Sequence, residues 1–381
     1  MSSTKFKVVM ILNYYSHHQS ELSEVLYRET GGRFCFIETE PMEIERKQMG
    51  WGGIHLPSFV KQSYTSDSEK KECLEICNEA EVVIIGSAPD TFIEERLKHN
   101  KLTFRYHERF FKEGRWHIFD PRVFISHYKK DFRYRNKNLY MLCASAYTAP
   151  DCRFIHCYKN KTFKWGYFPK VKKYDNISDL IEKKQKLSIL WVARFIKLKH
   201  PEAPLYVAKQ LKKAGYSFEM NLIGRGELEY QIKEIIQKNG LQDNVKLLGT
   251  MSPDEVRKFM EESEIFLFTS DRNEGWGAVL NESMNSACAV VANSAIGSVP
   301  YLINNGINGI IYKDGNLKDL YSKVKFLIDH DDERKKISQN AYETLLTTWN
   351  ADVAAKKLIE LIKILEQGNR PTYFEGPCSV D

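Results

Sequence analysis

Two carboxylates stand eight residues apart in the stretch Glu274-Gly-Trp-Gly-Ala-Val-Leu-Asn-Glu282, which also holds two glycines and the start of an apolar segment. Before it lies the β-like run Ile265-Phe-Leu-Phe-Thr-Ser270, and after it Ala289-Val-Val-Ala292 has the composition of another buried strand. We therefore predict a strand, a glycine-containing turn and a helix. Such a turn suits an anion, because the first N–H groups of a helix have no partner within it. Carboxylates beside a phosphate-binding turn suit sugar hydroxyls, so the stretch predicts a nucleotide-sugar site.

The rest of the chain alternates between short apolar runs and amphipathic segments. We predict strands at residues 7–12, 33–38, 81–86, 102–106, 139–143, 187–193, 218–223, 245–248, 265–270, 289–292 and 310–312. Helices are predicted near residues 20–27, 70–77, 92–99, 204–214, 227–239, 253–262, 316–329 and 351–367. This alternation favours parallel sheets with helices on both faces, and a length of 381 residues favours two domains. The fold class predicted is α/β, with two doubly wound, Rossmann-like domains and a cleft between them.

Composition and cysteines restrict the class of protein. With 43% hydrophobic and 28% charged residues, the chain has the composition of a globular protein. No run reaches about 18 apolar residues, so no membrane-spanning helix is expected. The segment Met1–Lys7 has no signal-peptide core, and we expect a cytoplasmic location. The eight cysteines form no Cys-x-x-Cys pair and are expected to be reduced core residues, as the helical spacing of Cys73 and Cys77 indicates.

The net charge of +6 is concentrated in two basic stretches of the first half, residues 127–137 and 170–173. The first stretch interleaves basic residues with aromatics, which suits an anionic membrane surface, a phosphorylated acceptor or nucleic acid. An ordinary solvated face is the alternative interpretation. We predict peripheral association with anionic membranes at their inner face, and nucleic acid is not a partner that we expect.

Four motifs of the second half resemble those of the family 4 glycosyltransferases, in the same order. The segment 270–284 is similar to the block S-x-x-E-G-F-G-x-x-x-x-E-A-M, and Trp191–Lys199 to a G-R-L-x-x-x-K turn. Leu222-Ile-Gly-Arg-Gly226 resembles a G-x-G turn. Ala295–Pro300, with Asn305–Gly309, resembles the G-G-x-P-E and N-G-x-x-G segments. In the first half, residues 13–19, 38–42 and 107–111 resemble a bacterial polysaccharide-type subset of this family.

The resemblance implies a GT-B fold, with an acceptor-binding domain at residues 1–169 and a donor-binding domain at residues 170–350. A C-terminal helix, within about residues 351–381, is implied to cross back to the first domain. The implied reaction is retaining transfer of a hexose-type sugar from a nucleotide-diphosphate sugar, without a bound metal or other cofactor. The implied acceptor is a glycan or a polyprenyl-phosphate-linked glycan.

Transfer leaves charge on a diphosphate, so the largest requirement is cationic stabilisation of that leaving group. Arg194 and Lys199 are the expected cations, since both occupy one strand-to-helix turn. Glu274 is expected to orient the transferred hexose, and Glu282 to accept hydrogen bonds from the ribose. The other predicted donor-binding residues are Gly224, Gly226, Gly275, Trp276, Gly277 and Leu280, with Trp276 beside the sugar. Ordinary surface cations, solvated carboxylates and helix-cap glycines are the alternatives.

On the acceptor side, His107 follows a predicted strand and is expected to face the cleft, as a catalytic or acceptor-orienting residue. A buried, hydrogen-bonded histidine is the alternative. His17 and His18, just beyond the first strand, are predicted to contact the acceptor, and Glu108 and Glu40 are lesser candidates. The run Asp329-His-Asp-Asp332 looks like a metal-binding motif, but we expect a solvated loop there.

Three other functions remain open from the sequence. An NAD-dependent oxidoreductase is disfavoured, because residues 10–19 after the first strand contain no glycine. A sugar-nucleotide epimerase on the same scaffold would interconvert sugars without an acceptor, since a fold does not determine a reaction. A non-catalytic protein that uses the basic stretch at residues 127–137 on membranes or nucleic acid would bind them in a salt-sensitive way.

Overall fold

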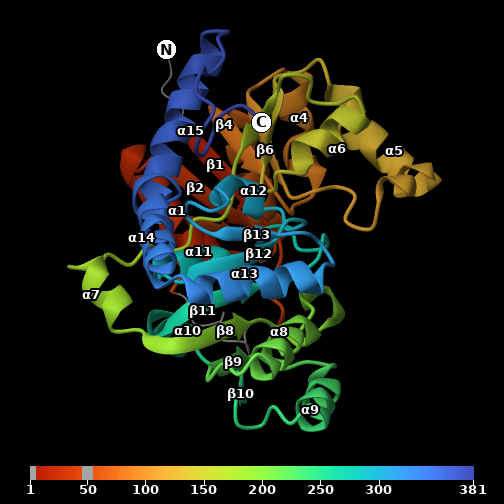
Figure 1. Cartoon of the computed structure of the whole chain (residues 1–381). Coiled ribbons are helices and arrows are strands. Elements are labelled where there is room, and N and C mark those ends of the chain that lie inside the picture. Colours follow the sequence, from red (N-terminus) through yellow and green to blue (C-terminus); the bar gives the residue numbers. More distant parts are fainter. Residues whose placement is uncertain (1–5, 45–54) are drawn as a thin grey trace. The chain divides into compact units, whose positions relative to one another are not determined.

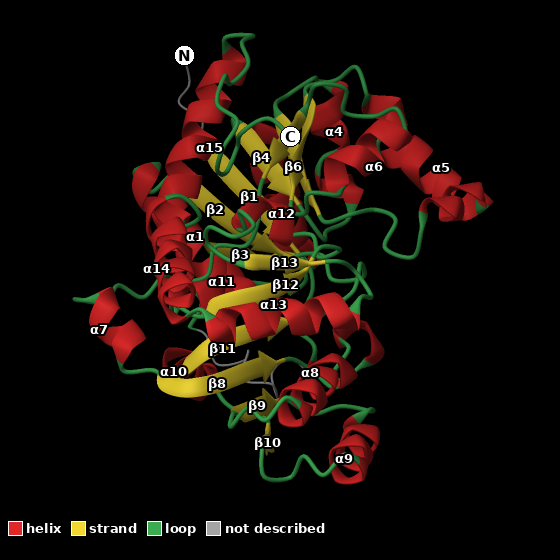
Figure 2. Ribbon diagram, viewed as in Figure 1, coloured by secondary structure: helices red, strands yellow, loops and turns green. Residues whose placement is uncertain are grey.

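The computed structural model describes residues 6–44 and 55–381. The chain divides into two compact units, residues 1–170 with 349–381 (unit 1) and residues 171–348 (unit 2). Each unit holds one parallel sheet with helices packed against it (Figures 1 and 2). The predicted α/β class with two Rossmann-like domains is therefore confirmed. The first five residues of the segment Met1–Lys7, where no signal-peptide core was predicted, lie outside the described residues.

The sheet of unit 1 has the order β3-β2-β1-β4-β5-β6-β7, and all its paired neighbours are parallel. Its strands are β1 (Val8–Leu12), β2 (Phe34–Glu38), β3 (Val60–Gln62), β4 (Val82–Ile85), β5 (Thr103–His107), β6 (Leu139–Cys143) and β7 (Thr162–Lys164). From the adjacent strands β1 and β4 the strand order runs outward in opposite directions, so the switch point of the sheet lies between them. Ligands of open α/β sheets bind at such a switch point. The carboxyl ends of these strands meet at one edge of the sheet.

One face of this sheet packs against α3 (Asp67–Glu79), α4 (Glu94–Lys98) and α6 (Thr148–Phe154). Cys73 and Cys77 lie on the buried side of α3, and all eight cysteines of the chain are buried free thiols, so the prediction of core cysteines is confirmed. Two further helices, α1 (His17–Glu29) and α15 (Ala351–Glu366), lie side by side (Figure 1) and are joined by an Arg28–Asp352 ion pair of 2.5 Å.

The last residues of the chain add to the edge of this sheet. The Cys378 N–H donates to the carbonyl of Lys164 at 2.7 Å, and the Lys164 N–H donates to that of Ser379 at 2.8 Å. Phe163 and Val380 form an antiparallel bridge there. The segment therefore covers hydrogen-bonding groups of β7 that an edge strand would otherwise expose.

The sheet of unit 2 has the order β10-β9-β8-β11-β12-β13 and is also parallel. Its strands are β8 (Gln185–Val192), β9 (Glu219–Ile223), β10 (Val245–Gly249), β11 (Ser263–Phe268), β12 (Ala289–Asn293) and β13 (Ile310–Tyr312). Its switch point lies between β8 and β11. The main core joins these strands to α8 (Glu202–Lys213), α9 (Glu229–Lys238) and α13 (Leu317–Asp329).

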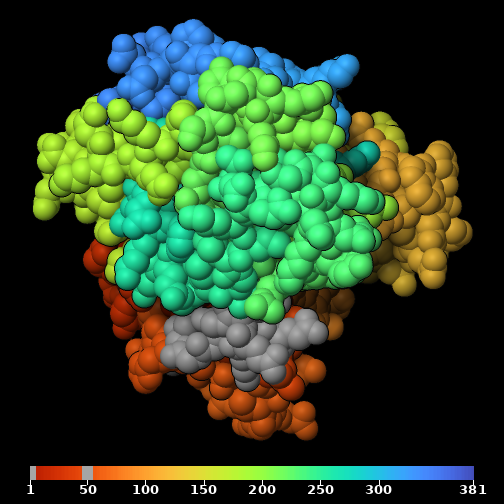
Figure 3. Space-filling model, turned by 60° about the horizontal axis from the view of Figure 1, so that its bottom comes forward, coloured from red at the N-terminus to blue at the C-terminus, as the bar shows by residue number. Residues whose placement is uncertain are grey.

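The remaining helices of unit 2 are α7 (Ile177–Glu182), α10 (Pro253–Glu262), α11 (Val279–Asn285), α12 (Val299–Leu302) and α14 (Asp331–Thr347). Local sequence explains where α10 begins, because Ser252 and Glu255 form a reciprocal capping box and Pro253 occupies the first turn. In the space-filling view, the green atoms of residues around 200–250 form much of the face turned to the reader (Figure 3).

Helix α14 corrects one expectation. The run Asp329–Asp332 is not a loop: Asp329 ends α13, and Asp331 and Asp332 lie in the first turn of α14. Asp331 pairs there with Arg334 and Lys335. The acidic first turn and the buried spacing of Ile337, Ala341, Tyr342 and Leu345 could have predicted this helix.

Several short elements were not predicted, namely β3, β7, α6, α7 and α12, the helix α5 (Pro121–Lys130), and the 3-10 turns η3 (Arg115–Phe119), η4 (Phe132–Tyr134) and η5 (Lys197–Lys199). The predicted helix near residues 92–99 corresponds to α4 and the 3-10 turn η2 (Asp90–Phe92) before it. In the part of the chain that the structure describes, no helix combines the length and the apolar character that crossing a bilayer requires.

Candidate functional site

Two loops of unit 2 meet at the carboxyl ends of its central strands. One follows β8 and contains Arg194 and Lys199, and the other follows β11 and contains Glu274. Because β8 and β11 are neighbours on either side of the switch point, side chains 75 residues apart in the chain come into contact. This edge is where an open parallel sheet binds its ligand.

Lys199 and Glu274 form an ion pair between Nζ and Oε2. The same carboxylate oxygen accepts a hydrogen bond of 2.9 Å from Ser270 Oγ. The two paired side chains are only 16% and 14% exposed, so water screens the pair less than it would on an open surface. Within residues 6–44 and 55–381, no hydrogen bond to the other oxygen, Oε1 of Glu274, is found.

Backbone contacts between the loops hold Lys199 in place. The hydroxyl of Thr269 donates to the carbonyl of Lys199 at 2.7 Å and accepts from the indole N–H of Trp191 at 2.8 Å. The Asp271 N–H donates to the carbonyl of Leu198 at 2.9 Å. Trp191 is fully buried, so this chain of bonds runs from the core to the site.

Arg194 differs from Lys199 in being exposed. Its side chain has no hydrogen bond or ion pair with any part of the chain that the structure describes. A guanidinium in such a place can turn toward an anion without giving up a protein partner. The structure therefore joins Lys199 to Glu274 and leaves Arg194 beside them on the same loop.

Gly224 and Gly226 lie against the Arg194 loop. A Cβ on Gly224 would come within 1.9 Å of the Ala193 carbonyl oxygen, and one on Gly226 within 2.4 Å of the Phe195 carbonyl oxygen. The Phe195 N–H also donates to the Arg225 carbonyl at 2.8 Å. Both glycines are needed because two backbone segments touch, which positions the turn that carries Arg194.

The turn around Trp276 is internal. Trp276 is fully buried, and its indole N–H donates to Asn281 Oδ1 at 2.8 Å. Leu280 is also fully buried. The Trp276 ring fills the core beneath the turn in this structure, and its predicted place beside a sugar stays a prediction. Gly277 has a φ of +77°, and a Cβ there would meet Phe268 at 2.3 Å.

Glu282 lies on α11, and its side chain is partly buried. Burial raises the pKa of its carboxyl, although the positive charge of Arg257 lowers it. Arg257 donates to the Glu282 carbonyl at 3.1 Å and to Asn285 Oδ1 at 3.0 Å. Among the described residues, the Glu282 carboxylate itself has no hydrogen-bond partner, so it is available to a ligand hydroxyl.

The predicted acceptor-side residues gather in unit 1. The rings of His17 and His18 are 4.0 Å apart at the start of α1, and the His18 ring is 5.8 Å from that of Tyr167. The hydroxyl of Tyr167 donates to Glu108 Oε1 at 2.8 Å, and Lys112 Nζ donates to Oε2 at 2.7 Å. Glu108 directly follows His107 in the chain. Tyr167 therefore contacts both predicted sets of residues, His18 of the His17–His18 pair and Glu108 of the His107–Glu108 pair.

Two of these histidines have a lowered pKa. Burial lowers the pKa of His17. The His107 side chain is exposed, but the protein atoms around it still lower its pKa through desolvation. Its Nδ1 lies 2.7 Å from the Glu108 carbonyl, and its ring is 4.8 Å from that of Phe110. Tyr167 was not singled out from the sequence, so its place in this cluster was missed. Glu40 is exposed.

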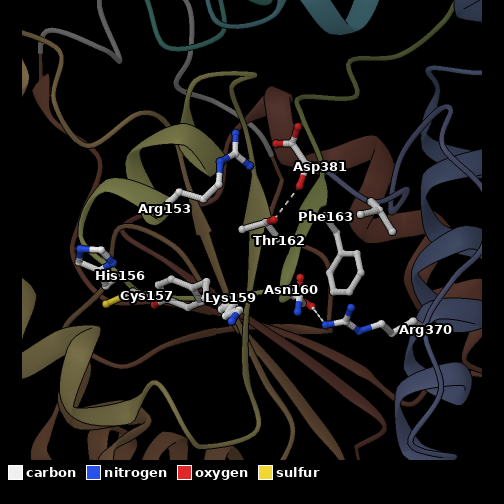
Figure 4. Close-up of a pocket in the computed structure, with 11 residues that line it drawn as sticks. Arg153, His156, Cys157, Lys159, Asn160, Thr162, Phe163, Arg370 and Asp381 are labelled. Atoms are coloured by element: carbon white, nitrogen blue, oxygen red, sulfur yellow. Dashed lines mark hydrogen bonds between the residues drawn. The ribbon is translucent and has the colours of Figure 1, made fainter.

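A cavity of about 510 Å³ lies elsewhere in unit 1, beside the pairing of β7 with the last residues (Figure 4). It contains none of the predicted site residues. Its wall includes the polar side chains of Arg153, His156, Lys159, Asn160, Arg370 and Asp381. Arg370 reaches across to donate to the Asn160 carbonyl at 2.8 Å.

Comparison with known proteins finds a match within unit 2. Residues 173–344 match the family model of the glycosyl transferases group 1. The chain is 30% identical over 186 residues to the amylovoran biosynthesis glycosyltransferase AmsK of Erwinia amylovora, a match that covers 48% of this chain and 46% of that protein. It is 24% identical over 171 residues to the poly(ribitol-phosphate) alpha-N-acetylglucosaminyltransferase of Staphylococcus aureus, covering 45% of this chain and 34% of that protein. The chain thus spans about half or less of the length of these curated relatives.

Solved structures extend the likeness to nearly the whole chain. HepE from Anabaena, in complex with UDP, superposes with a TM-score of 0.69 at 14% identity and covers 94% of this chain and 100% of that one. A glycosyltransferase from Rickettsia africae gives a TM-score of 0.65 at 15% identity, covering 96% of this chain and 100% of that one. At these identities the likeness shows the fold. Residues 173–344 of the chain therefore resemble the glycosyl transferases group 1, and its two Rossmann-like domains have the GT-B fold.

Proposed function

We propose that the protein is a retaining glycosyltransferase that moves a hexose-type sugar from a nucleotide-diphosphate sugar to a glycan or polyprenyl-phosphate-linked glycan. The observation that carries the proposal is the Lys199–Glu274 ion pair, with Ser270, at the switch point of a group 1 glycosyl transferase domain. A cation and a carboxylate held side by side suit a ligand in which a phosphate adjoins a sugar.

In this proposal, Arg194 and Lys199 stabilise the charge that develops on the leaving diphosphate. An ammonium group has three N–H donors, so Lys199 can hold Glu274 and a phosphate oxygen together. The exposed guanidinium of Arg194 can grip two oxygens at once. These two cations take the role of neutralising charge, so no metal ion or other cofactor is assigned.

The carboxylates recognise the sugars. Glu274 keeps Oε2 on Lys199 and Ser270 and presents Oε1 to hydroxyls of the transferred hexose. Glu282 accepts hydrogen bonds from the ribose. A cation or a hydroxyl that donates a hydrogen bond favours the charged form of a carboxylate. A bound nucleotide sugar would therefore lower the pKa of Glu282 from its raised value.

On the acceptor side, the cluster of His17, His18, His107 and Glu108 orients the attacking hydroxyl. In a front-face retaining reaction the leaving phosphate takes the acceptor proton, so His107 acts as a positioning residue in this proposal. The lowered pKa values of His17 and His107 keep both rings neutral near pH 7, where an imidazole can donate one hydrogen bond and accept another.

A panel of UDP-, GDP-, ADP- and CMP-sugars, tested by thermal shift, would identify the donor. UDP-sugars come first, because the HepE structure is a complex with UDP. A donor present at about 100 times its dissociation constant should add about 2.7 kcal/mol to the stability of the folded state. Arg194→Met should lose this shift without a change in its ligand-free unfolding midpoint. Lys238→Met, an exposed cation of α9, is the matched control and should keep the shift.

Release of the nucleoside diphosphate is then measured with glycan acceptors. Release that depends on an acceptor supports the transferase. Conversion of the donor sugar without any acceptor would favour the epimerase, and no shift with any nucleotide sugar would contradict the proposal.

A further inference from the structure

A short stretch of unit 1 exposes an unusual number of large apolar side chains. It consists of η3 and α5, and we refer to residues 115–130 as the α5 surface. The exposed fractions are 66% for Trp116, 84% for Phe119, 57% for Phe124, 49% for Ile125 and 51% for Tyr128. Large apolar side chains gathered in this way mark an interaction site, whereas single ones are ordinary.

Helix α5 turns these side chains outward on one side. Phe124, Ile125 and Tyr128 are spaced i, i+1 and i+4, which places them on one face of the helix. No residue of α5 is fully buried, and its partly buried positions are Val123, Ser126 and His127. In Figure 1 the helix projects from the rest of unit 1, and in Figure 3 its gold segment stands at the right margin.

The opposite side of α5 is fixed to the core. His127 Nδ1 lies 2.9 Å from Asp131 Oδ2, and Asp131 Oδ1 accepts from the Tyr158 hydroxyl at 2.6 Å. Arg105 Nε lies 3.4 Å from the same carboxylate. Asp131 is buried, so these contacts hold the end of the helix firmly. The orientation of the aromatic face is therefore set by the fold.

Basic residues surround the apolar face. Residues 115–135 contain six Lys or Arg and two Asp. One of these aspartates is the buried Asp131, and the other, Asp120, pairs with Arg122 at 2.8 Å. The exposed cations are Arg115, Arg122, Lys129, Lys130, Arg133 and Arg135. Arg115 pairs with the buried Asp151 at 3.2 Å, so Lys129, Lys130, Arg133 and Arg135 make the solvent-facing charge of the segment positive.

We propose that the α5 surface docks the protein on an anionic phospholipid membrane. Trp116, Phe119 and Phe124 enter the boundary between headgroups and acyl chains, and Lys129 and Lys130 lie among the phosphates. Amphipathic helices with aromatic and basic faces bind membranes in this way. A protein partner fits less well, because the cores of protein–protein interfaces are depleted of Lys. The inference goes beyond the transfer reaction and does not depend on it.

Vesicle co-sedimentation of the full chain tests the docking without any nucleotide sugar. Vesicles of phosphatidylglycerol and phosphatidylcholine in equal parts should bind the protein, and vesicles of phosphatidylcholine alone should not. Binding should weaken as salt rises from 0.1 M to 0.5 M, because salt screens the basic side chains.

Two sets of variants separate the apolar and charged contributions. The triple variant Trp116→Ser, Phe119→Ser, Phe124→Ser should lower partitioning to the anionic vesicles at least roughly tenfold. Lys129→Glu with Lys130→Glu should do the same, since each cation near an anionic surface contributes roughly fivefold. Tyr230→Ser and Phe374→Ser, with side chains 72% and 70% exposed, are matched controls and should bind as the wild type does.

Further measurements keep the result interpretable. The unfolding midpoints of all variants should equal that of the wild type, because the altered side chains are exposed. Brominated lipids should quench wild-type tryptophan fluorescence, and Trp116→Phe should lose the quenching while keeping most of the binding.

Wild-type binding that ignores lipid charge, or a triple variant that binds as well as the wild type, would overturn the docking. A third outcome would also overturn the docking: the wild type does not bind vesicles but forms a dimer in sedimentation velocity, and the triple variant does not form this dimer. The α5 surface would then join two copies of the chain. A donor-induced thermal shift, measured on the same samples, reports on the transfer proposal separately. Its absence with intact vesicle binding counts against that proposal alone.

Discussion

Lys199 and Glu274, which lie 75 residues apart in the chain, are held together as a partly buried ion pair at the carboxyl ends of β8 and β11. The sequence assigned the two residues to different parts of one ligand, the lysine to a phosphate and the glutamate to a sugar. Their contact shows that each side chain sets the position of the other. A change at either residue should therefore affect both functions.

Glu274→Gln keeps the shape of the side chain but removes its charge. We expect kcat/KM for transfer to fall by roughly 10²–10³, the loss typical of an electrostatic group that acts on the transition state. The free energy of unfolding should fall by about 1–3 kcal/mol, because Lys199 loses a charged hydrogen-bond partner. Initial rates and urea denaturation measure the two effects. Glu229→Gln, which breaks the exposed pair with Lys233 on α9, is the control and should leave the rate unchanged. An equal rate loss in both variants would disprove the assignment of Glu274.

Gly224→Ala tests the contact between the two loops. The residue has a φ of +138°, and its new Cβ would lie 1.9 Å from the Ala193 carbonyl oxygen. Because backbone must move, we expect a loss of more than about 2 kcal/mol in unfolding free energy. Gly315→Ala has a φ of +68° but open space around it, so its cost should be about 1 kcal/mol. Urea denaturation midpoints measure both variants: Gly224→Ala reports the clash together with the backbone strain, and Gly315→Ala reports the backbone strain alone. Similar midpoints would show that the loops are not in tight contact.

Glu282 should make stability depend on pH. Burial raises the pKa of its carboxyl in the folded chain above the ordinary value of 4.5. A group with a raised folded pKa stabilises the fold below its unfolded pKa, and this contribution is lost as pH rises through the folded value. Without donor, Glu282→Gln should therefore be at least as stable as the wild type at pH 7, and the difference should vanish below about pH 4.

Thermal unfolding of both proteins from pH 4 to pH 8 measures this effect. The same variant should bind the donor at least roughly tenfold more weakly, because a hydrogen bond to a charged group is lost. Glu262→Gln, at an exposed position on α10, should change neither quantity. A wild type that becomes more stable than Glu282→Gln as pH rises would contradict the raised pKa.

The cysteines should be unreactive until the chain unfolds. All eight are buried, and burial raises the pKa of the Cys73 thiol to about 11 and that of Cys157 to about 12. At pH 8 a thiol with a pKa near 11 is thiolate in only about one molecule per thousand, and the thiolate is the reactive form. Titration with a thiol-reactive disulfide reagent should find almost no fast-reacting group in the native protein and eight after denaturation. A rapidly labelled native thiol would show that one cysteine is accessible.

Much of the architecture could be predicted because it depends on local patterns. Buried parallel strands contain continuous apolar runs such as Val8–Leu12 and residues 289–292, and the amphipathic segments between them must be helices that cover the sheet. The order of the glycine-containing turns and of Arg194, Lys199 and Glu274 along the chain was sufficient to indicate the family that residues 173–344 resemble. Helix α14 was missed because its first two turns are almost entirely polar, so its apolar face appears only from Ile337 onward.

The side-chain arrangement at the site was decided by the tertiary structure. No periodicity in the sequence shows that the loop after β8 meets the loop after β11, since that contact depends on which strands are neighbours in the sheet. The same holds for Trp276, whose surroundings in the core make it a packing residue, and for Tyr167, which reaches Glu108 across 59 residues. The sequence by itself thus determined the elements, their order and the residue types at the site. Only folding decided which of these residues touch, because packing brings together atoms that the chain keeps far apart.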